Sequence, residues 1–154
     1  MVTVAQRLAA LGIALPPPAA PLALYRAATR AGALVYVSGQ LATRDGKVLH
    51  PGRLGAGVSM EQGREAARAA ALNALAAAQA LLGSLDGVRV VRLTGYVACE
   101  PGFTEQPQVL NGASELLRDA LGEEAGVGAR VAIGVVALPA GSPVELDLIL
   151  DVGA

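Results

Sequence analysis

The sequence has very few of the residue types on which most catalytic and cross-linked sites depend. Its 154 residues include one cysteine, one histidine and no tryptophan. A single cysteine excludes an internal disulfide, and a single histidine excludes a histidine-rich metal site or a relay of two histidines. A Ser-His-Asp triad would have to use His50, which stands in a segment typical of a loop. We therefore expect no metal site and do not favour a triad.

A basic surface is missing as well. The 12 lysine and arginine residues are spread along the chain, the formal net charge is −1, and aromatic residues make up 3% of the sequence. This argues against nucleic acid as the main partner, because nucleic-acid sites gather positive charge and aromatic side chains. The Ala-rich segment 69–85 contains Asn73, Gln79 and Ser84, which predicts a packed helix and no membrane span.

The N-terminal segment resembles a secretory signal only in part. A cationic residue precedes the apolar residues 8–15, but Gly12 interrupts this stretch and three prolines follow it. A capping box at 3–6 predicts a short helix over 3–11. We expect a cytoplasmic protein whose residues 1–21 form an N-terminal helix and a stiff, proline-rich connector.

Small apolar residues are what the chain has in abundance. Hydrophobic residues make up 53% of the sequence and the mean hydropathy is +0.49, with the volume supplied mainly by alanine, valine, leucine and glycine. The length fits one main domain, which we place at 22–154. Such a chain buries more apolar surface than a lone monomer can hide, so the composition predicts a homo-oligomer.

The predicted elements alternate between strands and helices. A second capping box, at 59–62, opens a long helix that ends before Gly83. Strands are predicted over 22–29, 33–38, 88–98, 129–138 and 144–152, and helices over 3–11, 59–82 and 107–121. This order predicts an α+β fold with helices packed on one face of the sheet.

Arg130 opens a run of ten residues that carries no other charge. An arginine cannot be neutralised, so a half-buried one needs an anionic partner, and a ligand carboxylate held by two parallel hydrogen bonds would serve. In a strand, Arg130 shares one face with Ala132 and Gly134, whose small side chains would leave room for a ligand.

A purely structural interpretation stays open for each candidate residue. Arg130 could pair with Glu123 or Glu124, while Glu145 could belong to a solvated face with Asp147 and Asp151. The remaining alternatives concern the aromatic, polar and thiol side chains: an ordinary strand aromatic for Tyr25, a backbone partner for Asn111, a simple strand end for Ser38 and Gly39, and a small buried hydrophobe for Cys99.

Several short segments also fit one family pattern in order and separation. They are Val35–Gln40, Ala66–Arg68 with Asn73–Leu75, Val109–Ser114, Gly128–Arg130, Ala137–Pro139 and Val144–Leu146. Together they resemble the RidA family, also called YjgF/YER057c/UK114, from about Tyr25 to Val152. The resemblance implies a chorismate-mutase-like fold, homotrimers with a ligand cleft between subunits, and hydrolysis of reactive 2-imino acids to 2-keto acids and ammonia.

The resemblance also implies roles for individual residues. Arg130 is similar to the carboxylate-binding arginine, Glu145 to the acid that orients the attacking water, and Tyr25 to the cleft tyrosine. Further substrate-binding positions are matched by Ser38, Gly39 and Asn111, with Ala132 at a place where a cysteine is common. This alanine and the additional N-terminal helix indicate a longer, less characterised branch of the family.

The implied chemistry needs few functional groups. An iminium carbon is already electrophilic, so a protein has to hold the carboxylate, place a water and accept a proton, without metal or cofactor. The expected partner is a small carboxylate metabolite, a 2-imino or 2-keto acid. Two other functions remain possible: a non-catalytic trimer that binds such metabolites as a sensor or stabiliser, and an endoribonuclease or translation inhibitor, against which the weak basicity counts.

Overall fold

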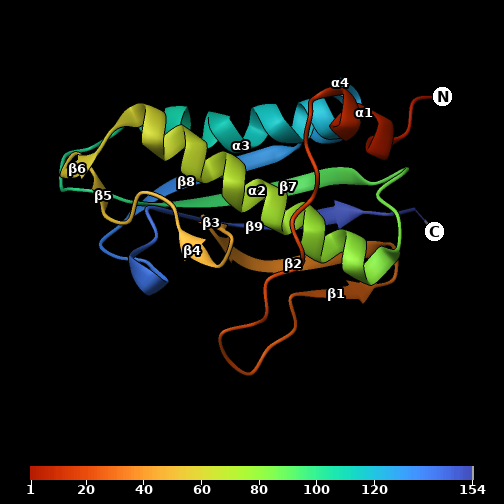
Figure 1. Cartoon of the computed structure of the whole chain (residues 1–154), viewed down its shortest axis with the longest axis horizontal. Coiled ribbons are helices and arrows are strands. Elements are labelled where there is room, and N and C mark those ends of the chain that lie inside the picture. Colours follow the sequence, from red (N-terminus) through yellow and green to blue (C-terminus); the bar gives the residue numbers. More distant parts are fainter. Residues whose placement is uncertain (154) are drawn as a thin grey trace.

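The computed structural model describes residues 1–153, which form a five-stranded sheet with two long helices on one face (Figure 1). The sheet order is β1-β2-β9-β7-β8, and every neighbouring pair is antiparallel except β7 with β8, so the sheet is mixed. The strands are β1 (Ala28–Ala31), β2 (Leu34–Leu41), β7 (Arg89–Ala98), β8 (Ala129–Val135) and β9 (Val144–Asp151). The helices on the face are α2 (Met60–Leu82) and α3 (Gln106–Leu121). The predicted α+β sheet with helices on one face is confirmed.

Short elements complete the chain. They are the helices α1 (Val4–Ala10) and α4 (Glu123–Gly126), the 3-10 turn η1 (Pro139–Gly141), and the two-residue strands β3 (Thr43–Arg44), β4 (Lys47–Val48), β5 (Arg53–Leu54) and β6 (Gly57–Val58). The β3–β4 hairpin and β5–β6 pair lie in the crossover between β2 and α2.

The long helix α2 begins and ends where its sequence predicts. The Ser59 side chain accepts a hydrogen bond from the Gln62 N–H, and the Gln62 side chain in turn accepts one from the Ser59 N–H, which completes the capping box. Gly83 closes the helix at a φ of +81°, a left-handed conformation that favours glycine. The helix buries a stripe of alanines, and these small side chains let it approach the sheet and α3 closely.

The strand β9 shows why the sheet has one buried and one open face. Its buried side chains Leu146, Leu148 and Leu150 point to the helices, while Glu145 and Asp147 alternate with them and are half-buried on the other face. The long helices α2 and α3 both lie on the first face and leave that second face open (Figure 1). Polar groups near Glu145 therefore remain accessible in a single chain.

The N-terminal helix α1 packs on the domain. Its predicted capping box forms between Thr3 and Gln6. The side chains of Val4 and Leu8 are 8% and 5% exposed and belong to the same hydrophobic core as the sheet. A hydrogen bond from the Val4 N–H to Asp86 Oδ1, 2.8 Å long, ties the helix to the turn before β7. The connector after α1 then runs past α2 to a loop beneath the sheet (Figure 1).

Three strand boundaries were predicted wrongly. The strand β2 continues to Leu41, three residues past the predicted end at residue 38, because it pairs with β9 up to Glu145. The first strand begins at Ala28, not at residue 22, because the preceding residues bend away and the Leu24 side chain is fully exposed. The strand β8 ends at Val135, not at residue 138, because its last partner is Ala98 and the chain then turns at Pro139. The four-residue helix α4 was missed. No helix among residues 1–153 is long and apolar enough to cross a membrane, as predicted for segment 69–85.

Candidate functional site

The open face of the sheet carries a cavity of about 630 Å³ around Glu145. Four of the predicted site residues line it: Tyr25 from the loop before β1, Ser38 and Gly39 from β2, and Glu145 from β9. The structure therefore brings together residues that are as much as 120 positions apart in the chain, counted from Tyr25 to Glu145. Asp147 also lines the cavity.

The position of Glu145 depends on an irregularity in the sheet. The pairing of β2 with β9 shifts register between Val37 and Gln40, and Glu145 then pairs with Leu41. The Glu145 side chain lies across Gly39, where a Cβ atom would be 3.0 Å from Cδ and closer still to Oε1. A glycine is therefore needed at 39 for close approach, and not for an unusual backbone angle.

The surroundings of Glu145 favour its protonated form. Burial raises the pKa of the Glu145 carboxyl above its usual value, and the negative charge of Asp147 raises it further. The Tyr96 hydroxyl donates a hydrogen bond of 3.0 Å to Asp147 Oδ2, which orients that second carboxylate. Burial, followed by this hydrogen bond, also raises the pKa of Tyr96. A carboxylate of raised pKa accepts a proton more readily than an ordinary one, as a general base must.

Tyr25 and Ser38 are held by local backbone contacts. The Tyr25 hydroxyl accepts a hydrogen bond of 3.3 Å from the Leu22 N–H, and the ring is 44% exposed. The Ser38 hydroxyl donates a hydrogen bond of 2.5 Å to the carbonyl of Arg26. The second contact fixes the loop before β1 to β2, and the first joins Tyr25 to Leu22 within that loop, so both hold Tyr25 in the wall of the cavity.

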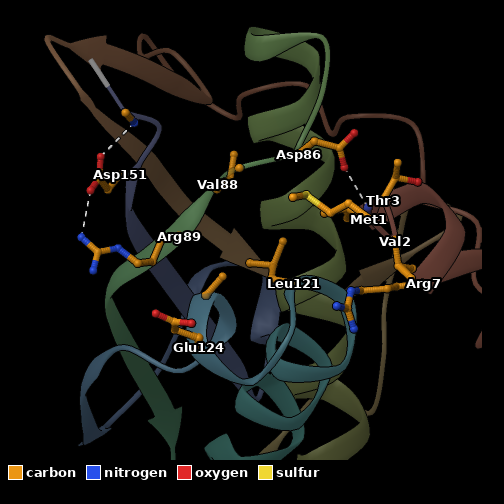
Figure 2. Close-up of a pocket in the computed structure, with 14 residues that line it drawn as sticks. Met1, Val2, Thr3, Arg7, Asp86, Val88, Arg89, Leu121, Glu124 and Asp151 are labelled. Carbon is orange, nitrogen blue, oxygen red and sulfur yellow. Dashed lines mark hydrogen bonds and ion pairs between the residues drawn. The ribbon is translucent and has the colours of Figure 1, made fainter.

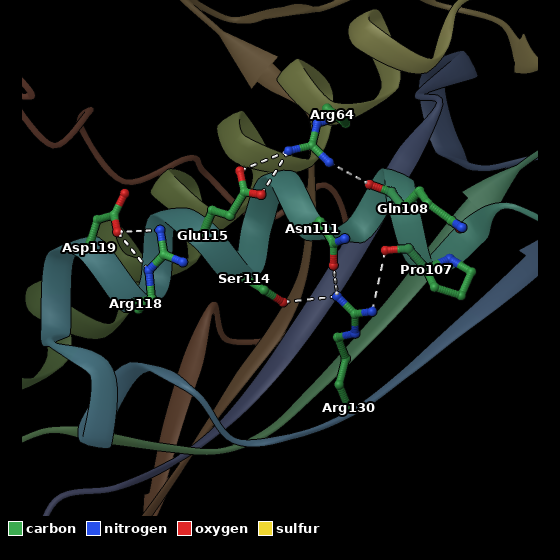
Figure 3. A network of polar contacts seen from close by, with 9 residues as sticks. All are labelled: Arg64, Pro107, Gln108, Asn111, Ser114, Glu115, Arg118, Asp119 and Arg130. Carbon is green, nitrogen blue, oxygen red and sulfur yellow. Dashed lines mark hydrogen bonds and ion pairs between the residues drawn. The ribbon is translucent and has the colours of Figure 1, made fainter.

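Arg130 lies apart from this cavity, on the helix side of the edge strand β8 (Figure 3). One guanidinium nitrogen donates to Asn111 Oδ1 at 2.9 Å and to Ser114 Oγ at 3.1 Å, and the other terminal nitrogen donates to the Pro107 carbonyl at 3.3 Å. All three acceptors are neutral, and they occupy three of the five guanidinium donors. Within the described part of the chain no acidic group forms an ion pair with Arg130, so the alternative pairing with Glu123 or Glu124 is wrong.

Arg130 and Glu145 lie on opposite faces of the sheet. Arg130 pairs with Leu93, which is buried on the helix side, whereas Glu145 pairs with Tyr96 on the open side. One chain therefore cannot bring both groups to the same ligand.

The room predicted beside Arg130 is not free. A Cβ atom on Gly134 would lie 2.8 Å from Gln106 Nε2 and 2.9 Å from Cys99 Sγ, so the start of α3 and the Cys99 thiol fill this space. Ala132 is partly buried and packs against the core, and its role in substrate binding stays a prediction. The expectation that Cys99 is a small buried side chain is confirmed, since it is 8% exposed.

Other ionisable groups are engaged in structural contacts. His50 Nε2 lies 2.8 Å from Glu65 Oε2, and this contact with His50 lowers the pKa of Glu65. A further cavity, of about 520 Å³, lies where α1 meets the ends of α3 and β9 (Figure 2). On its wall Arg89 pairs with Asp151 at 2.9 Å. Residues 1–153 contain no group of three or more His, Cys, Asp or Glu side chains that could hold a metal ion.

The sequence did not predict the residues that support Glu145 in its cavity and Arg130 beside α3. Asp147 lines the cavity beside Glu145 and accepts a hydrogen bond from Tyr96, and the spacing of Glu145 and Asp147, two apart in a strand, was the available signal. Ser114 stands three residues after Asn111 on α3, so the helical period could have placed both beside Arg130.

The comparison with known proteins decides the family. Residues 5–149 match the family model described as "YjgF/chorismate mutase-like, putative endoribonuclease". The chain belongs to this family, the RidA superfamily. Protein TCP17 from Trypanosoma cruzi is 46% identical over 149 residues, which cover 96% of this chain and 93% of that protein.

Two solved structures are similar over nearly the whole chain. Protein Atu1372 from Agrobacterium tumefaciens, of unknown function, is 41% identical with a TM-score of 0.90 and covers 97% of this chain and 92% of its own. A "putative endoribonuclease" from Shewanella oneidensis is 34% identical with a TM-score of 0.92, and the match covers 97% of this chain and 99% of that chain. The YjgF gene product of E. coli is 22% identical with a TM-score of 0.62, and E. coli TdcF with bound serine is 20% identical at the same score.

These values place the chain in a branch of the family distinct from YjgF itself. The predicted chorismate-mutase-like fold, with a mixed sheet, packed helices and an N-terminal helix, is confirmed.

Proposed function

We propose that this protein is an enamine/imine deaminase that hydrolyses 2-imino acids to 2-keto acids and ammonia. The observation that carries this proposal is the half-buried Glu145 carboxyl of raised pKa, which lies in an open cavity together with Tyr25, Ser38 and Gly39. Glu145 orients a water molecule and takes one of its protons while the water oxygen bonds to the carbon of the protonated imine, whose C=N electron pair moves to nitrogen. Glu145 then returns the proton to the nitrogen of this carbinolamine. The C–N bond breaks, ammonia leaves, and the hydroxyl loses its proton as the keto group forms.

Arg130 supplies the carboxylate site in this proposal. Its guanidinium is fixed by neutral acceptors on α3, so its positive charge is left for an anionic ligand. A planar fork held in one orientation can bind a carboxylate through two parallel hydrogen bonds at little cost in side-chain entropy. Asn111 is then a positioning residue that acts through Arg130.

A homotrimer with clefts between subunits completes the site. Arg130 and Glu145 lie on opposite faces within one chain, so a cleft that contains both needs Arg130 from one subunit and Glu145 from its neighbour. Large apolar side chains are exposed, among them Leu22 at 73% on the wall of the Glu145 cavity and Val136 at 77% directly after β8, and an interface would cover them. Serine bound to E. coli TdcF, which shares the fold, supports a small amino-acid-like ligand.

The proposal is tested by turnover of 2-aminoacrylate generated in situ. Wild type should release ammonia faster than the spontaneous reaction, and both Glu145→Gln and Arg130→Lys should be impaired. Arg64 on α2 and Glu115 on α3 form an ion pair of 2.8 Å (Figure 3). Arg64→Lys and Glu115→Gln are therefore matched controls that should keep wild-type activity. A wild-type rate equal to the spontaneous rate would overturn the deaminase proposal.

A non-catalytic binder of small carboxylates is the second candidate. The cradle around Arg130 is complete without Glu145 and stands on different elements, so carboxylate binding does not require the catalytic half of the site. Binding of a 2-keto acid without any turnover would favour this candidate.

A further inference from the structure

A smaller cavity, of about 160 Å³, adjoins the Glu145 cavity. The two share four wall residues, Leu22, Tyr25, Gly39 and Leu41, so they meet at the loop before β1 and the end of β2. A ligand held at Glu145 can therefore extend a substituent into the smaller space.

Besides the loop before β1 and the end of β2, three segments that lie far apart in the sequence form the smaller cavity. They are the proline-rich connector with Ala19, Ala20 and Pro21, the β3–β4 hairpin with Thr43, Gly46 and Val48, and Ala140 in the turn η1. Apart from the Tyr25 hydroxyl, no ionisable group stands among its wall residues.

Two polar side chains in its wall, Thr43 and Gln40, make hydrogen bonds within the protein. Thr43 accepts two hydrogen bonds from the Asn73 amide, through its carbonyl and its hydroxyl, and the Gln40 amide donates to the Ser38 carbonyl. A charged substituent would lose its hydration and find no oppositely charged group in this wall, which is costly. An apolar substituent has no such cost and replaces water at an apolar wall.

We propose that this cavity is a side-chain subsite of the cleft, so that the preferred substrates are 2-imino acids with apolar side chains of leucine to phenylalanine size. This rests on the proposed deaminase function. An apolar cavity of about 150 Å³ accepts a benzene molecule, so the observed volume of about 160 Å³ admits the isobutyl group of leucine or the ring of phenylalanine. The prolines of the connector restrict its backbone, so the wall is formed before the substrate binds.

The size dependence of turnover tests the subsite. Imino acids would be generated in situ by amino-acid oxidation, from alanine, 2-aminobutyrate, leucine, phenylalanine and glutamate. Each methylene buried should raise kcat/KM about fourfold, so the leucine-derived imine should exceed the alanine-derived one by well over tenfold, and the glutamate-derived imine should be poor. Equal kcat/KM across the series, or a preference for the alanine-derived imine, would overturn the subsite.

Substitutions in the wall make the test specific to this cavity. Ala20→Leu should fill the cavity and abolish the preference for large side chains while leaving the alanine-derived imine unaffected. Val48→Ala should enlarge it and shift the preference towards the phenylalanine-derived imine. Ala14→Leu is the matched control, because Ala14 lies exposed in the same connector and does not line the cavity. A selectivity in Ala20→Leu that is unchanged from wild type would contradict the assignment.

Binding measurements separate the two proposals. Turnover that does not depend on the size of the substrate side chain would contradict the subsite and leave the proposed deaminase function in place. If no imine is hydrolysed, calorimetry with pyruvate and with the keto acid of leucine still tests the subsite, since the larger keto acid should bind more tightly and Ala20→Leu should remove the difference. If the protein neither turns over an imine nor binds a keto acid, both proposals fail.

Discussion

Replacing Gly39 by alanine should disable the proposed site while leaving the fold intact. The new Cβ would lie 3.0 Å from Glu145 Cδ and would overlap Oε1, so the carboxylate has to move by about 1 Å or more. A misplacement of about 1 Å can cost about 100-fold in rate. The displaced atoms are the end of a flexible side chain and the φ of Gly39 is not left-handed. The free energy of unfolding should therefore change by no more than about 1 kcal/mol.

The assay compares imine turnover, keto-acid affinity and thermal denaturation for wild type and Gly39→Ala. A double-mutant cycle with Glu145→Ala identifies the cause, because an effect transmitted through Glu145 disappears when that carboxylate is absent. Turnover close to wild type in Gly39→Ala would refute the reasoning. An equal loss of activity in the presence and absence of the Glu145 side chain would refute it too, since the glycine would then act by another route.

Three other outcomes are expected. Arg130→Lys should weaken keto-acid binding by about 1.5 to 3 kcal/mol, measured by calorimetry, because an ammonium cannot reproduce the two-point fork; unchanged affinity would make Arg130 purely structural. Glu145→Gln should lower kcat with little change in keto-acid affinity, and full activity would move the water-orienting role elsewhere. Burial and the Asp147 charge raise the pKa of Glu145. The base form is therefore lost at a pH above that of an ordinary glutamate, and Asp147→Asn should move the acid limb of the kcat profile to lower pH; a limb that stays in place would exclude Glu145 as the base.

The proposed trimer gives a further prediction. Light scattering should report a trimer at micromolar concentration, and a stable monomer would contradict a cleft shared between subunits.

Local sequence patterns determined much of the fold. The capping boxes at Thr3 and Ser59 fixed the starts of two helices, and Gly83 fixed the end of one, since a cap depends on residues within one helical turn. The alternation of leucine with acidic residues in β9 likewise predicted which side of the strand is buried. Boundaries failed where no local signal existed, as before Ala28, because a strand ends where its partner ends.

The sequence also identified both halves of the candidate site, but only through a family resemblance and not through their mutual geometry. Whether Arg130 and Glu145 share a face depends on the strand order, the parallel pairing of β7 with β8 and the register of β9, all of which join residues distant in the chain. The register shift that places Glu145 across Gly39 also depends on the pairing of two strands, β2 and β9, that are distant in the chain. Hydrophobic periodicity gives each side chain a face within its own strand, whereas neighbours across the sheet follow from long-range pairing that only the tertiary structure decides.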